Sequence, residues 1–484
     1  MADRYDLVII GGGPGGYTAA EHAARLGMHT VLVEKNEIGG ACINTGCVPA
    51  KSLLQATGVY RDIKKSSRFG ISAGSVSFDY AGLQEYKEEN VRKLRKQVMD
   101  RLEKSGVEII HGTGRLHRGN LVEIQTAAGT EYVRGDRVIL ANGARPVIPK
   151  IPGIDLPQVM TSKALLAASE WNYDRLVVIG GGVIGVELAT IYGTLGSEVT
   201  MLEMSSRLLD NMDETISCEL QESLEDKGIS VLCGVHVKGI YETGDGGPVE
   251  VEYRKGGKTC RIPADRVLIS AGRRPQMDEV LAEDCEVQLD KNGRPVIRAP
   301  YRTTQENVFA LGDTVSRMRL AHVAASQAAY LVEHFAKKGH RLQLSVVPNG
   351  MYVPLPLVPM CIFSDPEIAS VGFSGQDAAT YNMQVKTGIA MMRENGKSVL
   401  SDEMRGFVKL LFEKYTNTLV GAQIMCPRAT DMIGEMATAI ANGLTAYQLQ
   451  MAMRAYPTYG EAVAKAIGDA LSEDGEETGK RHGD

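Results

Sequence analysis

One glycine-rich pattern occurs twice in this chain of 484 residues and constrains its fold more than any other feature. It reads GGGPGG at positions 11–16 and GGGVIG at positions 180–185. Each copy lies between a short apolar run, typical of a buried strand, and a helical segment. A second apolar run then ends in an acid, Glu34 or Glu203, which in both copies follows the first glycine by 23 positions.

The three glycines at the first, third and sixth positions of this pattern have separate physical roles. The first glycine permits a tight strand-to-helix turn, the second lets backbone N–H groups approach a pyrophosphate, and the third lets helix and strand pack closely. The acid at the end of the second strand accepts hydrogen bonds from the ribose hydroxyls of an adenosine. We therefore expect two bound dinucleotides. A carboxylate at Glu203 would repel a 2′-phosphate, which favours NAD over NADP for the second site.

Of the eight cysteines, only Cys42 and Cys47 lie close together in the sequence. On a regular α-helix two Cα atoms at this spacing are about 8–9 Å apart, beyond the ~7 Å limit for a disulfide. The pair therefore needs an irregular turn, which Gly46 supplies, before a helix whose first turn can hold Pro49. At that helix N-terminus the dipole and Lys51 would lower the pKa of the Cys47 thiol. This pattern predicts a reactive thiol pair.

Composition excludes several classes of protein. The formal net charge is −6, from 53 Lys and Arg against 59 Asp and Glu, so no basic surplus is present to bind nucleic acid. No run approaches 18 consecutive apolar residues, and the N-terminus is acidic and then strand-like, so we expect neither a membrane span nor a signal peptide. Sparse cysteines with one close pair favour a cytoplasmic location, and we expect no metal site.

Together these motifs resemble the flavoprotein pyridine nucleotide-disulfide oxidoreductases of class I. Further segments that carry the resemblance are ADRVLISAGRRP (264–275), NVFALGD (307–313), LAHVA (320–324) and DPEIASVG (365–372). Nearly the whole chain is covered, and the motifs are closest to those of family members that oxidise dihydrolipoyl groups. The resemblance implies an α/β fold with two Rossmann-like dinucleotide-binding domains and an α+β C-terminal dimerisation domain.

The resemblance also implies domain limits. The FAD-binding domain is expected at residues 1–150 and 280–344, and the NAD-binding domain is inserted at 151–279. A dimerisation domain follows at 345–470, and residues 471–484, rich in Glu and Gly, are expected to form a flexible tail.

FAD is expected on the first glycine pattern, with Glu34 on its ribose and Asp313 near its ribitol and pyrophosphate. The residues that the resemblance assigns to FAD are Gly11, Gly13, Pro14, Gly16, Glu34, Lys35, Gly40, Ala41, Lys51, Gly143, Gly312, Asp313, Ala321 and His322. NAD(H) is expected on the second pattern. The residues assigned to NAD(H) are Gly180, Gly182, Ile184, Gly185, Glu203 and Gly272.

The expected catalytic residues follow from the same resemblance. Cys42 and Cys47 would form a redox disulfide, with Cys47 on the flavin side and Cys42 exchanging with the substrate. Lys51 and Glu187 match positions that form an ion pair beside the flavin. In this family each active site takes its acid–base pair from the partner subunit, so a homodimer is implied, and Glu461 matches the acid of that pair.

One departure from the family changes the expected chemistry. The histidine that precedes the Pro-Thr of the C-terminal motif is replaced by Tyr456, and no histidine occurs between positions 341 and 481. Histidine, with a pKa near 6.5, can deprotonate one thiol and reprotonate another, whereas tyrosine, near 10, is almost wholly protonated at neutral pH. Two catalytic hypotheses remain open: oxidation of a lipoyl-bearing protein by NAD⁺, or NADH-dependent reduction of a quinone, a metal ion or a small disulfide. A flavoprotein scaffold without catalytic activity is a further hypothesis, in which NADH would not reduce the bound flavin. A tyrosine that only packs at the interface is a third interpretation of this position.

Two smaller features complete the expectations. The family's Ala-Thr-Gly turn reads Ala141-Asn142-Gly143 here, and because Asn tolerates such turns we give the change little meaning. The charged run from Lys87 to Lys104 carries apolar residues at helical spacing, which predicts an amphipathic helix whose charged face is solvated.

Overall fold

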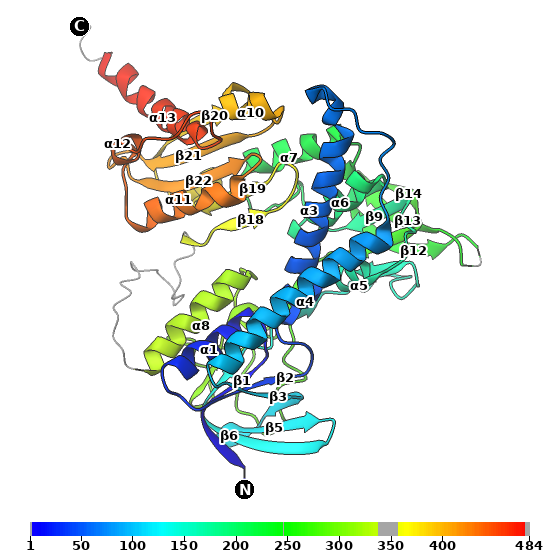
Figure 1. Ribbon diagram of the computed structural model, residues 1–484, viewed down its shortest axis with the longest axis vertical. Coiled ribbons are helices and arrows are strands. Elements are labelled where there is room, and N and C mark those ends of the chain that lie inside the picture. Colours follow the sequence, from blue (N-terminus) through cyan, green and yellow to red (C-terminus); the bar gives the residue numbers. More distant parts are fainter. Residues whose placement is uncertain (1, 245, 337–356, 480–484) are drawn as a thin grey trace. The chain divides into compact units, whose positions relative to one another are not determined.

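The computed structural model describes residues 2–244, 246–336 and 357–479, with the backbone alone for 473–479. These residues form two compact units (Figure 1). Within the described ranges, unit 1 holds residues 2–148, 161–171 and 271–336, and unit 2 holds 149–160, 172–270 and 357–479. Residues 151–279 are thus divided between the units. The expected domain limits stay a prediction, and the limit at 344/345 lies outside the described residues.

Unit 1 is built on a seven-stranded sheet with the order β3-β2-β1-β6-β5-β4, in which β17 also pairs with β6. The strands are β1 (Asp3–Ile10), β2 (Thr30–Glu34), β3 (Glu108–His111), β4 (Thr113–Leu116), β5 (Leu121–Thr126), β6 (Gly129–Leu140) and β17 (Val308–Ala310). Strands β3, β2, β1, β6 and β17 are parallel, while β4 and β5 form an antiparallel extension. The carboxyl ends of the parallel strands form the edge at which α/β sheets bind ligands.

Helices α1 (Pro14–Arg25) and α8 (Ala321–Phe335) pack on one face of this sheet. Alternate residues of β1 point to opposite faces: Leu7 and Ile9 join the helices, while Val8 and Ile10 join the core on the other face. Small residues of α1, such as Ala19 and Ala23, are fully buried and allow close packing on the sheet. Unit 1 also contains α2 (Gly40–Thr45), α3 (Cys47–Lys64), α4 (Tyr80–Lys104), α5 (Ser162–Ala167), β7 (Ala144–Pro146) and β16 (Arg273–Pro275).

The amphipathic helix predicted over the charged run is α4, with Val91, Val98 and Leu102 buried. The expectation of a solvated charged face is wrong for Lys87, which is only 2% exposed. Its ammonium group donates to the side chain of Gln84 and to the carbonyl oxygen of Leu166. A buried lysine is tolerated here because its hydrogen-bond donors are satisfied.

Unit 2 contains a second parallel sheet that repeats the logic of the first. Its order is β11-β10-β9-β15-β8, from β8 (Val159–Thr161), β9 (Arg175–Ile179), β10 (Glu198–Leu202), β11 (Ser230–Leu232) and β15 (Arg266–Ile269). Helices α6 (Val183–Leu195) and α7 (Glu214–Asp226) follow β9 and β10 along the chain. Unit 2 also contains a separate three-stranded antiparallel sheet, formed by β12 (His236–Glu242), β13 (Val249–Lys255) and β14 (Lys258–Ala264).

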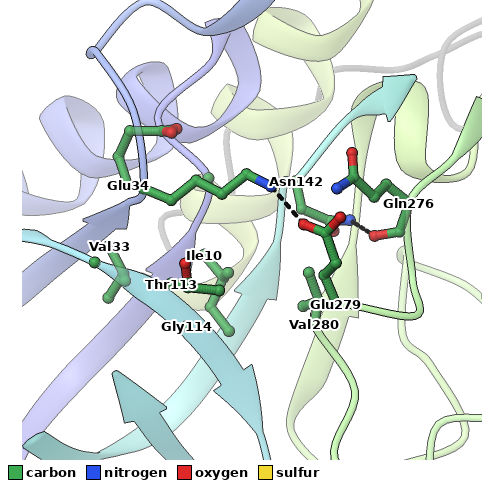
Figure 2. Close-up of a pocket in the computed structure, with 12 residues that line it drawn as sticks. Ile10, Val33, Glu34, Thr113, Gly114, Asn142, Gln276, Glu279 and Val280 are labelled. Atoms are coloured by element: carbon green, nitrogen blue, oxygen red, sulfur yellow. Dashed lines mark hydrogen bonds and ion pairs between the residues drawn. The ribbon is translucent and has the colours of Figure 1, made fainter. Parts of the chain in front are cut away.

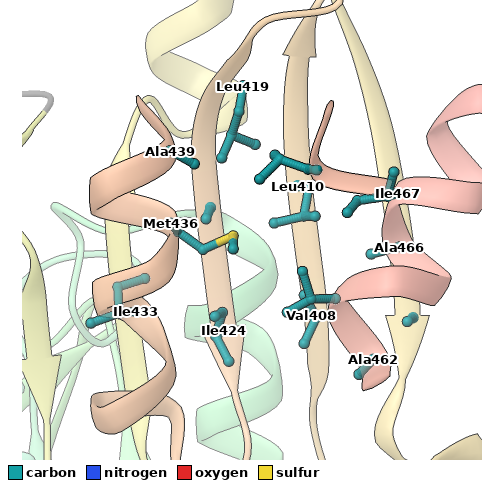
Figure 3. Close-up of a cluster of buried hydrophobic side chains, with 14 of the residues drawn as sticks. Val408, Leu410, Leu419, Ile424, Ile433, Met436, Ala439, Ala462, Ala466 and Ile467 are labelled. Carbon is teal, nitrogen blue, oxygen red and sulfur yellow. The ribbon is translucent and has the colours of Figure 1, made fainter. Parts of the chain in front are cut away.

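The C-terminal part of unit 2 is a five-stranded antiparallel sheet, β18-β19-β22-β21-β20, covered by helices. The strands are β18 (Met360–Ile362), β19 (Ile368–Gly372), β20 (Val385–Met391), β21 (Phe407–Glu413) and β22 (Leu419–Met425). The helices are α9 (Gly375–Thr380), α10 (Gly396–Ser401), α11 (Ala429–Ala441), α12 (Ala446–Gln450) and α13 (Glu461–Gly479). Figure 3 shows Ile433 and Met436 of α11 and Ala466 and Ile467 of α13 packed with strand residues in one apolar core.

The predicted fold class is confirmed: two Rossmann-like parallel sheets and a separate α+β part are present. Helix α13 continues to Gly479, past the residue at which the tail was expected to begin. Among the described residues, no helix is both long and apolar enough to cross a membrane.

Candidate active site

The first glycine pattern forms the turn between β1 and α1. Gly11 has φ +109°, and a Cβ there would lie 2.5 Å from the carbonyl oxygen of Ala141. A Cβ at Gly16 would overlap the carbonyl oxygen of Gly11. Gly13 caps α1 with extended backbone, and Pro14 occupies the first helical turn, where its missing N–H costs nothing. Only glycine fits the first and third positions, as the pattern predicts.

The acid that ends β2 is held by backbone groups on two sides. One carboxylate oxygen of Glu34 accepts a hydrogen bond from the N–H of Gly12 at 2.6 Å, and the other accepts from the N–H of Asn36 at 2.8 Å. The side chain is buried, with 9% of the residue exposed. These contacts fix the carboxylate beside the glycine turn, at the carboxyl edge of the sheet.

The second glycine pattern has the same geometry in unit 2. Gly180 has φ +111°, and a Cβ there would lie 2.6 Å from the carbonyl oxygen of Ser270. A Cβ at Gly185 would overlap the carbonyl oxygen of Gly180. Glu203, one residue after β10, accepts hydrogen bonds from the N–H of Gly181 at 2.5 Å and from the N–H of Ser205 at 2.6 Å. Gly182 caps α6, and Ile184 lies in its first turn.

Several further FAD candidates gather at the carboxyl edge of the unit 1 sheet. The N–H of Gly143, which has φ +72°, donates to the hydroxyl of Thr314 at 3.1 Å. Gly312 and Asp313 lie in a short 3-10 helix directly after β17. The Arg273 side chain is 3.9 Å from the Asp313 carboxylate. Burial raises the pKa of Asp313, against the opposing charges of Arg273 and Arg319.

The remaining predicted cofactor residues are placed as follows. Gly40 has φ +59° and faces the first turn closely, since a Cβ there would lie 2.6 Å from the Cα atom of Gly13. Ala41 follows it in the first turn of α2 and is exposed. Gly272, with φ +107°, precedes β16 and belongs to unit 1, and its contact with a cofactor stays a prediction. Ala321 and His322 begin α8.

A pocket opens beside the first turn and Glu34 (Figure 2). Figure 2 shows Val33 and Glu34 on one side of it, and Gln276 and Glu279 on the other. Gly11, Thr113 and Gly114 also line it. All of these residues belong to unit 1.

The two cysteines lie on successive helices that break at Gly46. Helix α2 ends at Thr45, Gly46 has the non-helical angles φ −142° and ψ −100°, and α3 begins at Cys47. Pro49 lies in the first turn of α3, as the sequence predicts. A Cβ at Gly46 would lie 2.9 Å from the carbonyl oxygen of Ala41, so a larger residue would disturb the break. The break is what allows two residues at this spacing to approach each other.

The thiols of Cys42 and Cys47 are within hydrogen-bonding contact. This contact and burial raise the pKa of the Cys42 thiol, and the charge of Lys51 acts in the opposite direction. Asp313 also acts on Cys42, so these four side chains lie close enough to influence one another electrostatically. Cys47 is exposed and Cys42 is partly buried. Tyr17 of α1, which the sequence analysis did not select, lies near both thiols: burial and the Cys42 charge raise its pKa.

Glu187 lies on α6 in unit 2 and is 4% exposed. Its carboxylate accepts a hydrogen bond from the backbone N–H of Phe363 at 3.1 Å. Lys51 lies on α3 in unit 1. The predicted ion pair between these two side chains stays a prediction.

The C-terminal motif lies on the segment that leads into α13. Tyr456 is 76% exposed. Its ring lies close to Gly396: a Cβ built on that glycine would be 3.1 Å from the Tyr456 hydroxyl oxygen. Glu461 is the first residue of α13. Its Oε2 atom is buried and has no hydrogen-bond partner within the described part of this chain. Both residues are therefore available for contacts that a single chain does not make.

The residues at the first turn fit FAD, and those at the second fit NAD(H). In each turn two glycines are required by close backbone contacts, and a carboxylate is fixed where a ribose would be bound. The glycines allow a pyrophosphate to reach the helix N-terminus, and the carboxylate can accept hydrogen bonds from a ribose. The thiol pair adds a group that can exchange two electrons by forming and breaking a disulfide.

Comparison with known proteins gives the same family for both parts of the chain. Residues 5–328 match the pyridine nucleotide-disulphide oxidoreductase family, and residues 358–467 match its dimerisation domain. The second match supports the predicted homodimer. Dihydrolipoyl dehydrogenase from Geobacillus stearothermophilus is 35% identical over 97% of this chain and 97% of its own length. Dihydrolipoyl dehydrogenase from Bacillus subtilis (strain 168) is 32% identical over 98% and 99%.

Among solved structures, the HOCl-induced flavoprotein disulfide reductase RclA from Escherichia coli has the same fold, with a TM-score of 0.84. It is 24% identical and aligns over 96% of this chain and 99% of its own. The resemblance to the family and the predicted FAD and NAD(H) are confirmed. The chain therefore belongs to the pyridine nucleotide-disulphide oxidoreductase family and is an FAD-dependent enzyme that exchanges electrons between NAD(H) and a disulfide.

Proposed function

We propose that this protein is a dihydrolipoyl dehydrogenase, which oxidises the reduced lipoyl group of a partner protein with NAD⁺ as the final acceptor. The contact between the thiols of Cys42 and Cys47 is the observation that carries the proposal. Relatives of that name, 32–35% identical over nearly the whole chain, support it. A lipoyl-bearing partner and a cytoplasmic location belong to the same proposal, and the sparse, paired cysteines support a reducing compartment.

The proposed reaction balances as dihydrolipoamide and NAD⁺ giving lipoamide, NADH and a proton. One substrate thiolate attacks the sulfur of Cys42 in a Cys42–Cys47 disulfide, and the second substrate thiol then displaces Cys42 and closes the lipoyl disulfide. The enzyme is left with two thiols that hold the two electrons. Bound FAD supplies the chemistry that converts a dithiol oxidation into a hydride transfer to NAD⁺.

The residues around the thiol pair have separate proposed roles in this reaction. Because the pKa of Cys42 is raised, its sulfur is a poor leaving thiolate, so the exchange needs a group that deprotonates the substrate thiol and protonates Cys42 as it is displaced. We assign that help to the C-terminal motif of the partner subunit, with Glu461 as its acid. Lys51 stabilises negative charge near the thiols, and we propose that Glu187 is its ion-pair partner.

The test is NADH formation from dihydrolipoamide and NAD⁺ by the purified FAD-loaded protein. Cys42→Ser and Cys47→Ser should each lower the rate by at least about 10³-fold, because a single sulfur cannot form the disulfide. Cys218→Ser is the matched control, since Cys218 is an exposed cysteine on α7 in unit 2 and belongs to no expected site. A wild-type rate no better than that of free FAD would end the lipoyl proposal. Equal rates for all three variants would exclude the thiol pair.

Tyr456 favours a second candidate, an NADH-dependent reductase of a non-lipoyl acceptor such as a quinone, a metal ion or a small disulfide. Its hydroxyl can donate a hydrogen bond to an acceptor oxygen, but at neutral pH it is a poor base for a thiol. Its high exposure leaves it accessible on the single chain. An assay of NADH oxidation against these three acceptors distinguishes the two candidates.

Replacing Tyr456 by His sharpens this choice. Positioned acid–base catalysis is worth about 10²–10⁴-fold, so Tyr456→His should raise dihydrolipoamide turnover by at least about tenfold while lowering any quinone or metal-ion reduction. Tyr447→His is the control, because Tyr447 is 53% exposed on α12 and belongs to no expected site. If Tyr456→His leaves both activities unchanged, the tyrosine only packs at the interface and the second candidate loses its support.

A further inference from the structure

The pocket beside the first glycine turn has two walls that come from distant parts of the chain. Glu34 ends β2 and Lys35 follows it on one side, and Gln276 and Glu279 follow β16 on the other (Figure 2). Two polar contacts connect the 276–280 segment to the rest of the pocket. The sheet already holds this segment by a backbone hydrogen bond from the N–H of Leu116 in β4 to the carbonyl oxygen of Val280, and the two side-chain contacts add to it.

The first contact is made by Asn142. Its side-chain nitrogen donates to the carbonyl oxygen of Gln276 at 2.6 Å and lies 3.7 Å from the sulfur of Met277. Because a carbonyl can only accept, this bond fixes which end of the amide is nitrogen. The oxygen of the same amide is buried and has no hydrogen-bond partner among the described residues.

A buried acceptor without a partner costs about 1–3 kcal/mol, so its donor is expected to come from outside the chain. Asn142 lines the pocket that also holds Glu34. The adenosine half of FAD offers such donors, namely its ribose hydroxyls and its amino group, whereas its phosphates offer none. Asn142, which stands where the family has threonine, can therefore accept a hydrogen bond from the adenosine.

The second contact is an ion pair across the pocket. The ammonium group of Lys35 donates to the carboxylate of Glu279 at 2.5 Å, with 40% and 41% of the two side chains exposed. That hydrogen bond lowers the pKa of Glu279 despite partial burial. Arg145 lies 4.0 Å from the other oxygen of Glu279 and pairs with Asp278 at 2.8 Å. Positive charge therefore holds this segment from two sides.

We propose that Asn142, Gln276, Lys35 and Glu279 form an adenosine clasp that sets how tightly the protein retains FAD. This rests on the FAD site described above and adds Asn142 and Glu279 to it as positioning residues. Asn142 serves twice: its nitrogen holds the 276–280 segment, and its oxygen accepts from the adenosine. The Lys35–Glu279 pair closes the same segment over the pocket.

The experiment measures release of FAD from the holoprotein on dilution, by the rise in flavin fluorescence. Asn142→Ala should release FAD about tenfold faster, because one hydrogen bond of about 1.4 kcal/mol corresponds to tenfold. Glu279→Gln should release it about twofold to fivefold faster, as expected for a partly exposed pair. Asp100→Asn is the matched control, since Asp100 pairs with Lys96 at 2.9 Å on α4, outside the pocket.

Salt provides an independent measurement. At 1 M salt the wild-type release rate should approach that of Glu279→Gln, whose own rate should change little, because screening removes a charge pair that the variant lacks. Urea unfolding of each apoprotein separates clasp effects from folding defects. Release at the wild-type rate from both Asn142→Ala and Glu279→Gln would overturn the clasp. A purified protein that holds no flavin at all would instead overturn the assigned family chemistry.

Discussion

The two glycine turns each connect a strand to a helix in a separate sheet, and their backbone geometries agree closely. Gly11 and Gly180 have φ values of +109° and +111°. Glu34 and Glu203 each accept one hydrogen bond from the N–H of the residue after the first glycine, Gly12 or Gly181, and one from the N–H two residues after the acid itself. The same backbone geometry therefore occurs in both sheets, as expected for two turns that each approach a pyrophosphate and a ribose.

The turns differ in how much protein surrounds them. A Cβ at Gly15 in the first turn would overlap the side chain of Leu311, and Gly13 faces the backbone of Gly40. At the second turn the position of Gly15 is taken by Ile184, and a Cβ at Gly182 would meet nothing within 4 Å. An enclosed turn suits a cofactor that stays bound, and an open turn suits one that enters and leaves in each cycle. The difference matches FAD on the first turn and NAD(H) on the second.

The largest effects on cofactor binding are expected from the third glycine of each turn. In Gly16→Ala and Gly185→Ala the new methyl group would overlap a backbone carbonyl that cannot move without opening the turn. Overpacking of this kind costs about 1–3 kcal/mol or more. Gly16→Ala should be isolated with little flavin. Gly185→Ala should keep its flavin but need at least about tenfold more NADH for half-maximal anaerobic flavin reduction. Flavin absorbance reports both results.

Two helical glycines with open space provide the controls. A Cβ at Gly58 of α3 or at Gly468 of α13 would meet nothing within 4 Å, so alanine there should be neutral or stabilise by about 0.5–1 kcal/mol. Loss of flavin in Gly185→Ala would contradict the assignment of separate roles to the two turns.

Local sequence spacing was sufficient to predict the turns, their acids and the break between the cysteines. The distances from Gly11 to Glu34 and from Cys42 to Cys47 are short, so the geometry follows from the chemistry of a few neighbouring residues. Gly46 shows this best, because the need for a non-helical residue there follows from the reach of a disulfide alone.

Contacts between distant residues could not be predicted in this way. Asn142 and Gln276 are separated by 134 positions, and Lys35 and Glu279 by 244. Nothing near Lys87 in the sequence indicates that it is buried against Leu166. The proposed acid–base partner of the thiols is a still stronger case, because a group supplied by a second subunit makes no contact with the thiols in the single chain.

The two units also contain ion pairs that differ in how far they are exposed to solvent. Unit 1 has the partly exposed Lys35–Glu279 pair, whereas unit 2 has Asp213, which is 1% exposed and bonded to Lys409 at 2.9 Å and to the N–H of Gly375 at 3.0 Å. Removing one member of a buried pair costs about 3–5 kcal/mol, against at most about 1 kcal/mol for an exposed pair. Asp213→Asn should therefore lower the free energy of unfolding in urea far more than Glu279→Gln does.

The same pair gives a pH dependence with a definite sign. Burial alone would raise the pKa of Asp213, but hydrogen bonds from Gly375 and Lys409 outweigh it and lower the pKa below its usual value. The stabilisation is therefore complete above the unfolded pKa, about 4, and is lost as the pH falls through the lowered folded pKa. The gap in stability between wild type and Asp213→Asn should narrow below pH 4. A gap that stays constant to pH 2 would contradict the ion pair.

Removing the charge of Glu203 should affect NAD(H), and removing the charge of Glu34 should affect FAD. Glu203→Gln removes the charge that repels a 2′-phosphate and weakens two charge-assisted hydrogen bonds, each worth about 1.5–3 kcal/mol at most. Its kcat/KM for NADH should fall about tenfold, and the preference for NADH over NADPH should fall by a similar factor. Glu34→Gln should leave that preference unchanged and release FAD faster. An equal loss of the preference for NADH over NADPH in both variants would mean that the two carboxylates do not contact separate cofactors.

The smallest effect tests a difference inside the repeated turn. Ser270 of the second turn corresponds to Ala141 of the first, and its hydroxyl lies 2.8 Å from the carbonyl oxygen of Gly180 and 3.1 Å from that of Ile179. Its single proton can serve only one acceptor at a time, so Ser270→Ala should lower the free energy of unfolding by about 1 kcal/mol. Ser472→Ala is the control, because that exposed hydroxyl bonds to the Asp469 carbonyl oxygen at 2.7 Å and its bond is replaced readily by water. Equal losses in the two variants would show that the second turn holds its shape through its glycines alone, as the first turn does with alanine at this position.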